Sequence, residues 1–193
     1  MNNNLLKYTT RIADNYLILG QRMSMWCSNG PTLEEDIALA NISLDLFGQA
    51  TAFYSYVAEL DNISADDLAF KRDAVDFLNY QIVELENKDF GYTIVRNFLF
   101  DTFNFLFYQE LIKSTNQQLS DIATKSIKEV KYHLRHSKNW IIRLGDGTKE
   151  SNKRVQHSLN NIWKYTGELF ELDHLDKTMI EEGIGVDTSL LKD

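Results

Sequence analysis

The chain has 193 residues, of which 28 are Asp or Glu and 20 are Lys or Arg, so its formal net charge at pH 7 is −8. This balance argues against a general nucleic-acid-binding protein, which needs a basic surface to neutralise phosphates. The single proline, the nine glycines and the single cysteine, Cys27, predict a helical protein without an internal disulfide.

The N-terminal residues lack the basic segment and apolar stretch of a secretion signal, and the sequence has no run of about 18 uninterrupted apolar residues. We therefore expect a cytoplasmic protein that binds neither membrane nor nucleic acid.

Apolar residues at steps of three and four predict a first long helix from about residue 5 to residue 26. Thr32 and Glu35 have the Thr-x-x-Glu spacing of a capping box, so a second helix should begin near Thr32 and run to about residue 60. The core-facing side chains that we expect on this second helix include Ile37, Leu44 and Phe47.

The same periodicity predicts further helices over about 68–85, open to an interruption, and over 90–113, 119–144 and 151–170. From Glu171 onward the periodicity is poor, and we expect an irregular tail. The sequence has no repeat, linker or domain boundary. It therefore predicts a single all-α domain over residues 1–193, a four-helix bundle with an additional C-terminal helix.

Four carboxylates, one on each long predicted helix, should lie at a similar height along the bundle axis. The separation is 31 residues between those of the first two helices and 28 residues between those of the other two, which suits a long helix, a turn and a return to the same height. These residues are Asp14, Asp45, Asp101 and Glu129. Bundles that hold two metal ions use one Glu from each of two helices and a Glu-x-x-His pair from each of the other two.

The histidines of that pattern are missing. Three residues after Asp45 stands Gly48, and three residues after Glu129 stands Tyr132, although His133 follows one position later. Two interpretations remain: a metal site with a reduced ligand set, or a buried polar network. We favour the network because charged residues are seldom buried unless they are paired.

In the network interpretation, Glu129 and His133 form the hub of one hydrogen-bonded cluster that joins the four helices. Arg11, about one turn before Asp14, is the expected counter-charge on the first helix. The other side chains expected to satisfy the carboxylates are Gln21, Asn41, Gln49 and Tyr132.

Two further features suggest contacts with other molecules. The predicted helix over 90–113 carries more aromatic residues than one core should accommodate, so we expect some of them to contact a partner. The helix over 119–144 carries a basic run, which is either a solvated face or an anion contact. The run comprises Lys125, Lys128, Lys131, Arg135 and Lys138.

Four scattered segments carry a recognisable pattern. They are Tyr132–Ser137 with Trp140 and Arg143–Thr148, Asp36–Ile42 with Leu44–Leu46 and Gly48–Ala50, Leu68–Phe70 with Arg72 and Asp73, and Trp163–Phe170. Together these segments resemble the C-subunit family of phenylacetyl-CoA epoxidases, phenylacetate degradation proteins of the ferritin-like superfamily. The resemblance extends from about Asp14 to Asp187.

The resemblance implies a ferritin-like fold and a structural, non-catalytic subunit of a ring-epoxidising oxygenase. The implied partners are the catalytic A subunit, which carries the di-iron centre, and the other epoxidase subunits; this chain would have no cofactor or catalytic residue of its own. In this view Asp14, Asp45, Asp101, Glu129 and His133 are remnants of a metal site. Because family members continue with a further C-terminal segment, the chain is expected to be truncated or a shorter variant.

Two alternatives stay open at this point. One is a metal-binding ferritin-like oxidase or oxygenase in its own right. The other is a helical module that binds an acyl-CoA through the basic run.

Overall fold

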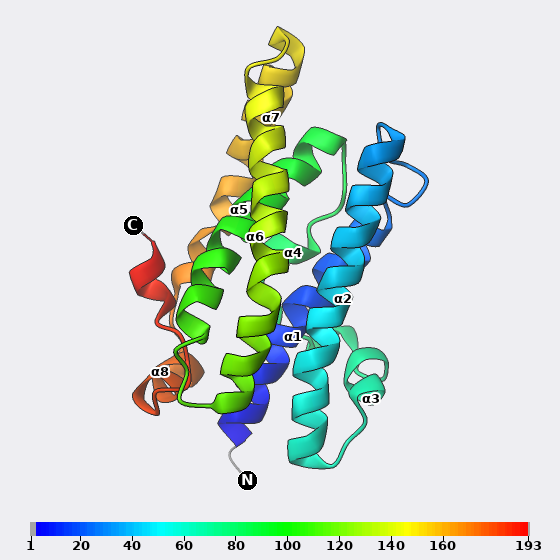
Figure 1. The fold of residues 1–193 in the computed structure, drawn as a ribbon. Helices are drawn as coiled ribbons and strands as arrows, with labels where there is room; N and C mark the ends of the chain where they lie inside the picture. Colours follow the sequence, from blue (N-terminus) through cyan, green and yellow to red (C-terminus); the bar gives the residue numbers. More distant parts are fainter. Residues whose placement is uncertain (1–2, 193) are drawn as a thin grey trace.

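The computed structural model describes residues 3–192, and every regular element in that range is helical (Figure 1). The four long helices are α1 (Asn3–Ser24), α2 (Leu33–Asp61), α5 (Phe90–Leu111) and α6 (Gln117–Gly145). The shorter helices are α3 (Ala65–Phe70), α4 (Gln81–Glu84), α7 (Lys149–Ile162) and α8 (His174–Glu181). The predicted all-α class is confirmed.

The long helices form two antiparallel hairpins, α1 with α2 and α5 with α6, which lie against each other along α2 and α6 (Figure 1). Because α2 ends at the end of the bundle opposite to that where α5 begins, residues 62–89 must cross the length of the bundle. One long crossover between two hairpins is the topology of ferritin-like bundles. The predicted ferritin-like fold is therefore confirmed.

Local sequence sets where the long helices begin. The Thr32 hydroxyl accepts a hydrogen bond from the Glu35 amide, so the second helix begins at the predicted cap. Asp89 and Asn116 cap α5 and α6 in the same manner, through side-chain oxygens 2.8 Å and 3.1 Å from amide nitrogens of the first turn. The connection between α5 and α6 is short, which forces these helices to run antiparallel.

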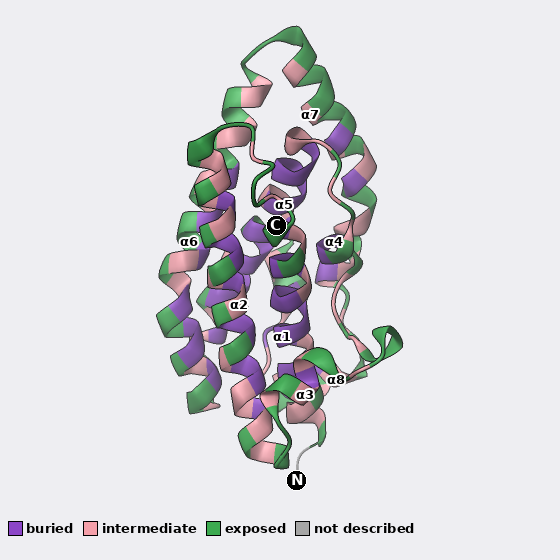
Figure 2. Cartoon of the chain, turned by 90° about the vertical axis from the view of Figure 1, so that its right-hand side faces the viewer, coloured by how far each residue is buried: buried purple, intermediate pink, exposed green. Residues whose placement is uncertain are grey.

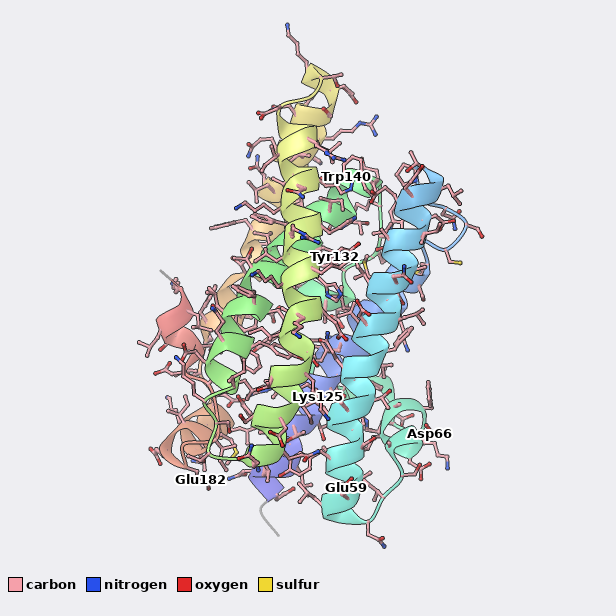
Figure 3. All side chains as sticks on the ribbon, in the orientation of Figure 1. Glu59, Asp66, Lys125, Tyr132, Trp140 and Glu182 are labelled. Atoms are coloured by element: carbon pink, nitrogen blue, oxygen red, sulfur yellow. The ribbon has the colours of Figure 1, made fainter. Side chains whose placement is uncertain are left out.

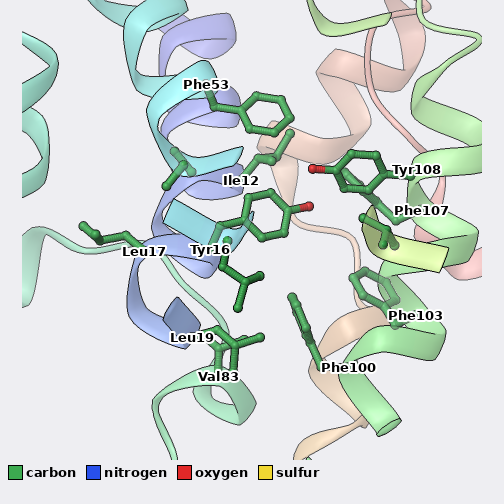
Figure 4. Close-up of a cluster of buried hydrophobic side chains, with 14 of the residues drawn as sticks. Ile12, Tyr16, Leu17, Leu19, Phe53, Val83, Phe100, Phe103, Phe107 and Tyr108 are labelled. Atoms are coloured by element: carbon green, nitrogen blue, oxygen red, sulfur yellow. The ribbon is translucent and has the colours of Figure 1, made fainter. Parts of the chain in front are cut away.

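Buried residues lie on the inner sides of all four long helices (Figure 2). At mid-bundle the Tyr16 ring of α1 lies between Phe53 of α2 and Tyr108 of α5, with both centroid distances 5.9 Å (Figure 4). Earlier in α5, the Phe103 ring lies 5.8 Å from the Phe107 ring. Aromatic burial of this kind supplies much of the hydrophobic stabilisation of the fold.

The segment predicted as a helix over 68–85, open to an interruption, is broken into the end of α3, one 3₁₀ turn at Ala74–Asp76 and α4. Between these short elements the backbone amides of Leu78 and Tyr80 bond to side chains of α1 and not to a helical turn. Side chains of α1 fix the crossover in place, through Asp14 and through Asn15, whose side-chain oxygen accepts a hydrogen bond from the Tyr80 amide at 2.8 Å.

The predicted irregular tail contains α8, so the expectation of no helix after Glu171 was wrong. Asp173 and Asp176 form a reciprocal capping box at its start. At its end Gly183, with φ of 70°, reverses the chain, and the Tyr8 hydroxyl then accepts a hydrogen bond from the Val186 amide at 3.0 Å. These contacts hold the tail on α1.

One expectation about packing was also wrong. Ile37 and Leu44, predicted for the core, are 54% and 65% exposed, because no other helix covers that side of α2 within the described residues. Every aromatic residue of α5 is buried or half-buried, and the C-terminal segment covers part of this helix; contact of the half-buried ones with a partner stays a prediction. Phe170, for example, contacts the Phe103 ring at 5.8 Å.

Candidate functional site

The five predicted site residues all lie on the long helices at mid-bundle. Asp14, Asp101 and His133 are buried, whereas Glu129 is half-buried and the Asp45 side chain is 33% exposed. The structure divides them into two groups, one around Asp14 and one along α6.

Asp14 is the anchor of the crossover. Its carboxylate accepts hydrogen bonds from the Tyr54 hydroxyl at 2.5 Å and from the Leu78 amide at 2.8 Å, and it forms an ion pair with the Arg72 guanidinium. Arg72 Nη1 lies 3.1 Å from Oδ2, and the Arg72 side chain also lies over the Phe77 ring at 4.1 Å. All the hydrogen-bond acceptor positions of this carboxylate are therefore occupied by groups of the protein itself.

The expected counter-charge for Asp14 was wrong. Arg11 instead pairs with Asp173 and Asp176, so it fastens α8 to α1. Arg72 could not be inferred, because it stands 58 positions away in a segment predicted to be helical.

The second group joins α2 to α6. His133 Nε2 lies 3.0 Å from Asp45 Oδ2, and the Gln49 amide donates to Glu129 at 3.0 Å. The Tyr108 hydroxyl in turn donates to Gln49 Oε1 at 3.1 Å, which links α5 to the same contacts. The predicted participation of Gln49 is confirmed.

The prediction that Glu129 and His133 form a common hub was wrong. His133 pairs with Asp45 across the helices and not with Glu129 on its own helix. Tyr132, Gln21 and Asn41, expected to donate to the carboxylates, are exposed side chains, because each lies on an outward-facing part of its helix. A further pair was missed: His136 Nε2 lies 2.8 Å from Glu35 Oε2, and both side chains are largely buried.

Asp101 lies between α5 and α6 and accepts a hydrogen bond from the Ser137 hydroxyl at 2.7 Å. Burial raises the pKa of Asp101 to about 6, although the nearby His133 and the Ser137 bond act in the opposite direction. At pH 7 this carboxyl is therefore mostly ionised, and the hydrogen bond from Ser137 is the contact that holds it against α6.

These donors do not fit a di-iron centre, the metal group that ferritin-like bundles of this type often hold. Across residues 3–192, no group of three or more His, Cys, Asp and Glu side chains is placed where it could hold a metal ion. Asp14 in particular is held by a guanidinium, whose positive charge would repel a metal cation. The arrangement instead joins helices through satisfied hydrogen bonds.

Other groups offer little catalytic chemistry. Cys27 is exposed and unpaired, and His157 is exposed and bonded to Asn161. In the part of the chain that the structure describes, no helix is long and apolar enough to cross a membrane.

Comparison with known proteins identifies the family. The model of the phenylacetic acid catabolic protein family matches residues 1–193. The chain belongs to the phenylacetic acid catabolic protein family. Within it, the chain is similar to the C subunit of 1,2-phenylacetyl-CoA epoxidase from Escherichia coli strain K12, with 46% identity over 191 residues that cover 98% of this chain and 77% of the relative. The resemblance found in the scattered sequence motifs is confirmed.

Proposed function

We propose that this phenylacetic acid catabolic family member is a non-catalytic, structural subunit of a phenylacetyl-CoA epoxidase. Its partner is the catalytic A subunit, which carries the di-iron centre, together with the other epoxidase subunits, and its location is the cytoplasm. The similarity to the C subunit of an epoxidase over 98% of the chain carries this proposal.

The geometry at mid-bundle supports the non-catalytic role. The remnant site residues Asp14, Asp45 and Glu129 are each bonded to a protein side chain from another segment, and Asp14 has its own counter-cation in Arg72. The chain therefore contributes a rigid helical body, and the chemistry belongs to the partner. The alternative, an oxygenase in its own right, would need a metal to displace Arg72 and to recruit imidazoles that α2 lacks.

Co-expression with the catalytic A subunit tests the pairing. We expect the two chains to elute together in size-exclusion chromatography at micromolar concentration, and separate elution would contradict the proposal. The A subunit expressed alone gives the reference elution volume.

Metal analysis tests the non-catalytic role. After anaerobic loading with ferrous iron and removal of unbound metal, we expect iron well below one atom per chain in this protein alone. An iron content near two per chain would favour the alternative function.

A further inference from the structure

Most of the exposed large apolar side chains of this protein lie on α2, α3 and the segments that flank them. Twelve large apolar residues are exposed within residues 3–192, and eight of them lie between Met25 and Leu78. Phe70 at the end of α3 is 72% exposed, and Val75 in the crossover is 90% exposed. Contiguous exposed apolar surface on a folded protein marks sites of association.

The α2 part of this surface is a single stripe. Leu33, Ile37 and Leu44 are 71%, 54% and 65% exposed and follow one another at steps of four and seven residues. Thr51, seven residues farther on, lines the groove that separates α2 from α3. The stripe therefore leads directly to α3.

Phe70 stands between two adjoining grooves. One groove, of about 380 Å³, lies between α1, α2 and α3, and the other, of about 640 Å³, lies between α1 and the crossover. Gln21, Ala69 and Phe70 line both. We call the surface formed by the α2 stripe, Phe70 and these two grooves the α2/α3 face.

The acidity of the chain is concentrated on the same segment. Residues 25–78 contain ten acidic and two basic residues, so their formal charge of −8 equals that of the whole chain. Both basic residues are already paired, Lys71 with Asp67 and Arg72 with Asp14. Figure 3 places the carboxylates of Glu59 and Asp66 on this side of the bundle.

The outer surface of α6 has the opposite character. Lys128, Lys131, Arg135 and Lys138 line a third groove, of about 600 Å³, and within the described residues none of them forms an ion pair. A partner drawn to the α2/α3 face by charge would therefore be repelled by α6.

We propose that the α2/α3 face docks a partner protein subunit whose contact surface has an apolar centre bordered by Lys and Arg. This inference rests on the proposed function, because it assigns the surface through which the subunit joins the assembly. The apolar side chains supply the buried centre of the contact, with Phe70 as its protruding anchor, and the surrounding carboxylates supply complementary charge. Association should accordingly weaken as ionic strength rises.

The role of Phe70 in the contact is tested with the variant Phe70→Glu and a matched control, Trp163→Glu. Trp163 is also an exposed aromatic residue, at 62%, but it lies outside the α2/α3 face. With the catalytic A subunit as the probe, we expect Phe70→Glu to weaken binding about tenfold or more and Trp163→Glu to leave it within about twofold. Circular dichroism and thermal unfolding of each variant establish that the fold is intact.

The charge complementarity is tested by reversing the charge of two residues on the α2/α3 face and, as a control, of two residues on α6. The exposed Asp66 and Asp73 take no part in an ion pair within residues 3–192, so the double variant Asp66→Lys/Asp73→Lys changes charge without breaking an ion pair. We expect this variant to weaken binding and to flatten its salt dependence, whereas Lys128→Glu/Lys138→Glu on α6 should not weaken it.

The outcomes separate the two proposals. If the wild-type chain fails to bind the A subunit, the proposed function is contradicted and this inference fails with it. If the wild type binds while Phe70→Glu and the double Asp variant bind equally well, only the docking surface is wrong. If Phe70→Glu instead converts a dimer of this chain alone into monomers, the face joins two copies and the proposed partner is wrong.

Discussion

Arg72 and Asp14 form an ion pair that joins the crossover to the centre of α1, with the Asp14 side chain completely buried and the Arg72 side chain 17% exposed. The Tyr54 hydroxyl lies 3.1 Å from Arg72 Nη2 and also donates to Asp14, so α2 takes part in the same contact. One carboxylate on α1 thus fixes the crossover segment next to Phe70, the anchor proposed for the α2/α3 face.

Arg72→Met should strongly destabilise the protein, because it leaves a buried carboxylate without its counter-charge. We expect the free energy of unfolding to fall by about 3 kcal/mol, measured by urea denaturation. In the double variant Asp14→Asn/Arg72→Met much of this loss should be recovered. Arg154→Ala, which removes the exposed pair with Glu150, is the control and should leave the stability nearly unchanged.

His133→Ala should weaken the contact between α2 and α6, because it removes the partner of Asp45 and leaves space in the core. We expect a loss of roughly 1 to 3 kcal/mol in the free energy of unfolding. His157→Ala, at an exposed position of α7, should be nearly neutral. Equal effects of the two substitutions would show that the Asp45–His133 pair does not contribute to stability.

Asp101→Asn should change how stability depends on pH. Because burial raises the pKa of Asp101 from 3.8 to about 6 in the folded protein, the folded state holds a proton that the unfolded chain has lost between these values. The contribution of Asp101 to stability is thus most favourable below pH 3.8, decreases as the pH rises to about 6 and is constant above. The free energy of unfolding of the Asn variant, relative to that of wild type, should therefore increase as the pH rises through this interval. At pH 7 the full increase of about 2 to 3 kcal/mol should be present. Parallel pH profiles of the two proteins, from thermal or urea unfolding, would contradict this prediction.

Arg11→Ala should release α8 from α1, because Arg11 is the cation shared by Asp173 and Asp176. We expect faster amide hydrogen exchange in residues 174–181, while protection in α5 stays unchanged. Loss of protection throughout the protein would mean that the pair stabilises the whole fold and not α8 alone.

Much of the fold could be predicted from the sequence. The four long helices appear within a few residues of the expected positions, since apolar side chains at steps of three and four record which residues share a helix face. The beginning of α2 at Thr32 and the short α5/α6 connection are local features that neighbouring residues determine. Helices supported by less periodic sequence, such as α8, were missed.

The candidate site was predicted in its residues but only partly in its contacts. Asp14, Asp45, Asp101, Glu129 and His133 do lie at mid-bundle, because they occupy matching positions along antiparallel helices, but they do not converge on one point. Gln49 was among the expected partners, whereas Arg72 of the crossover and Ser137 of α6 were not. No local pattern indicates which of several polar side chains will face a given carboxylate.

The helical class, the helix faces and, through scattered motifs, the family all follow from the order of the amino acids. Which faces are covered and which charges are paired depends on how the helices pack in three dimensions. Ile37 and Leu44 have the spacing of core residues, yet they are exposed because no helix in the described part of the chain packs on that side of α2. Periodicity is a property of one helix, whereas burial and charge pairing depend on the neighbours that the fold brings to it.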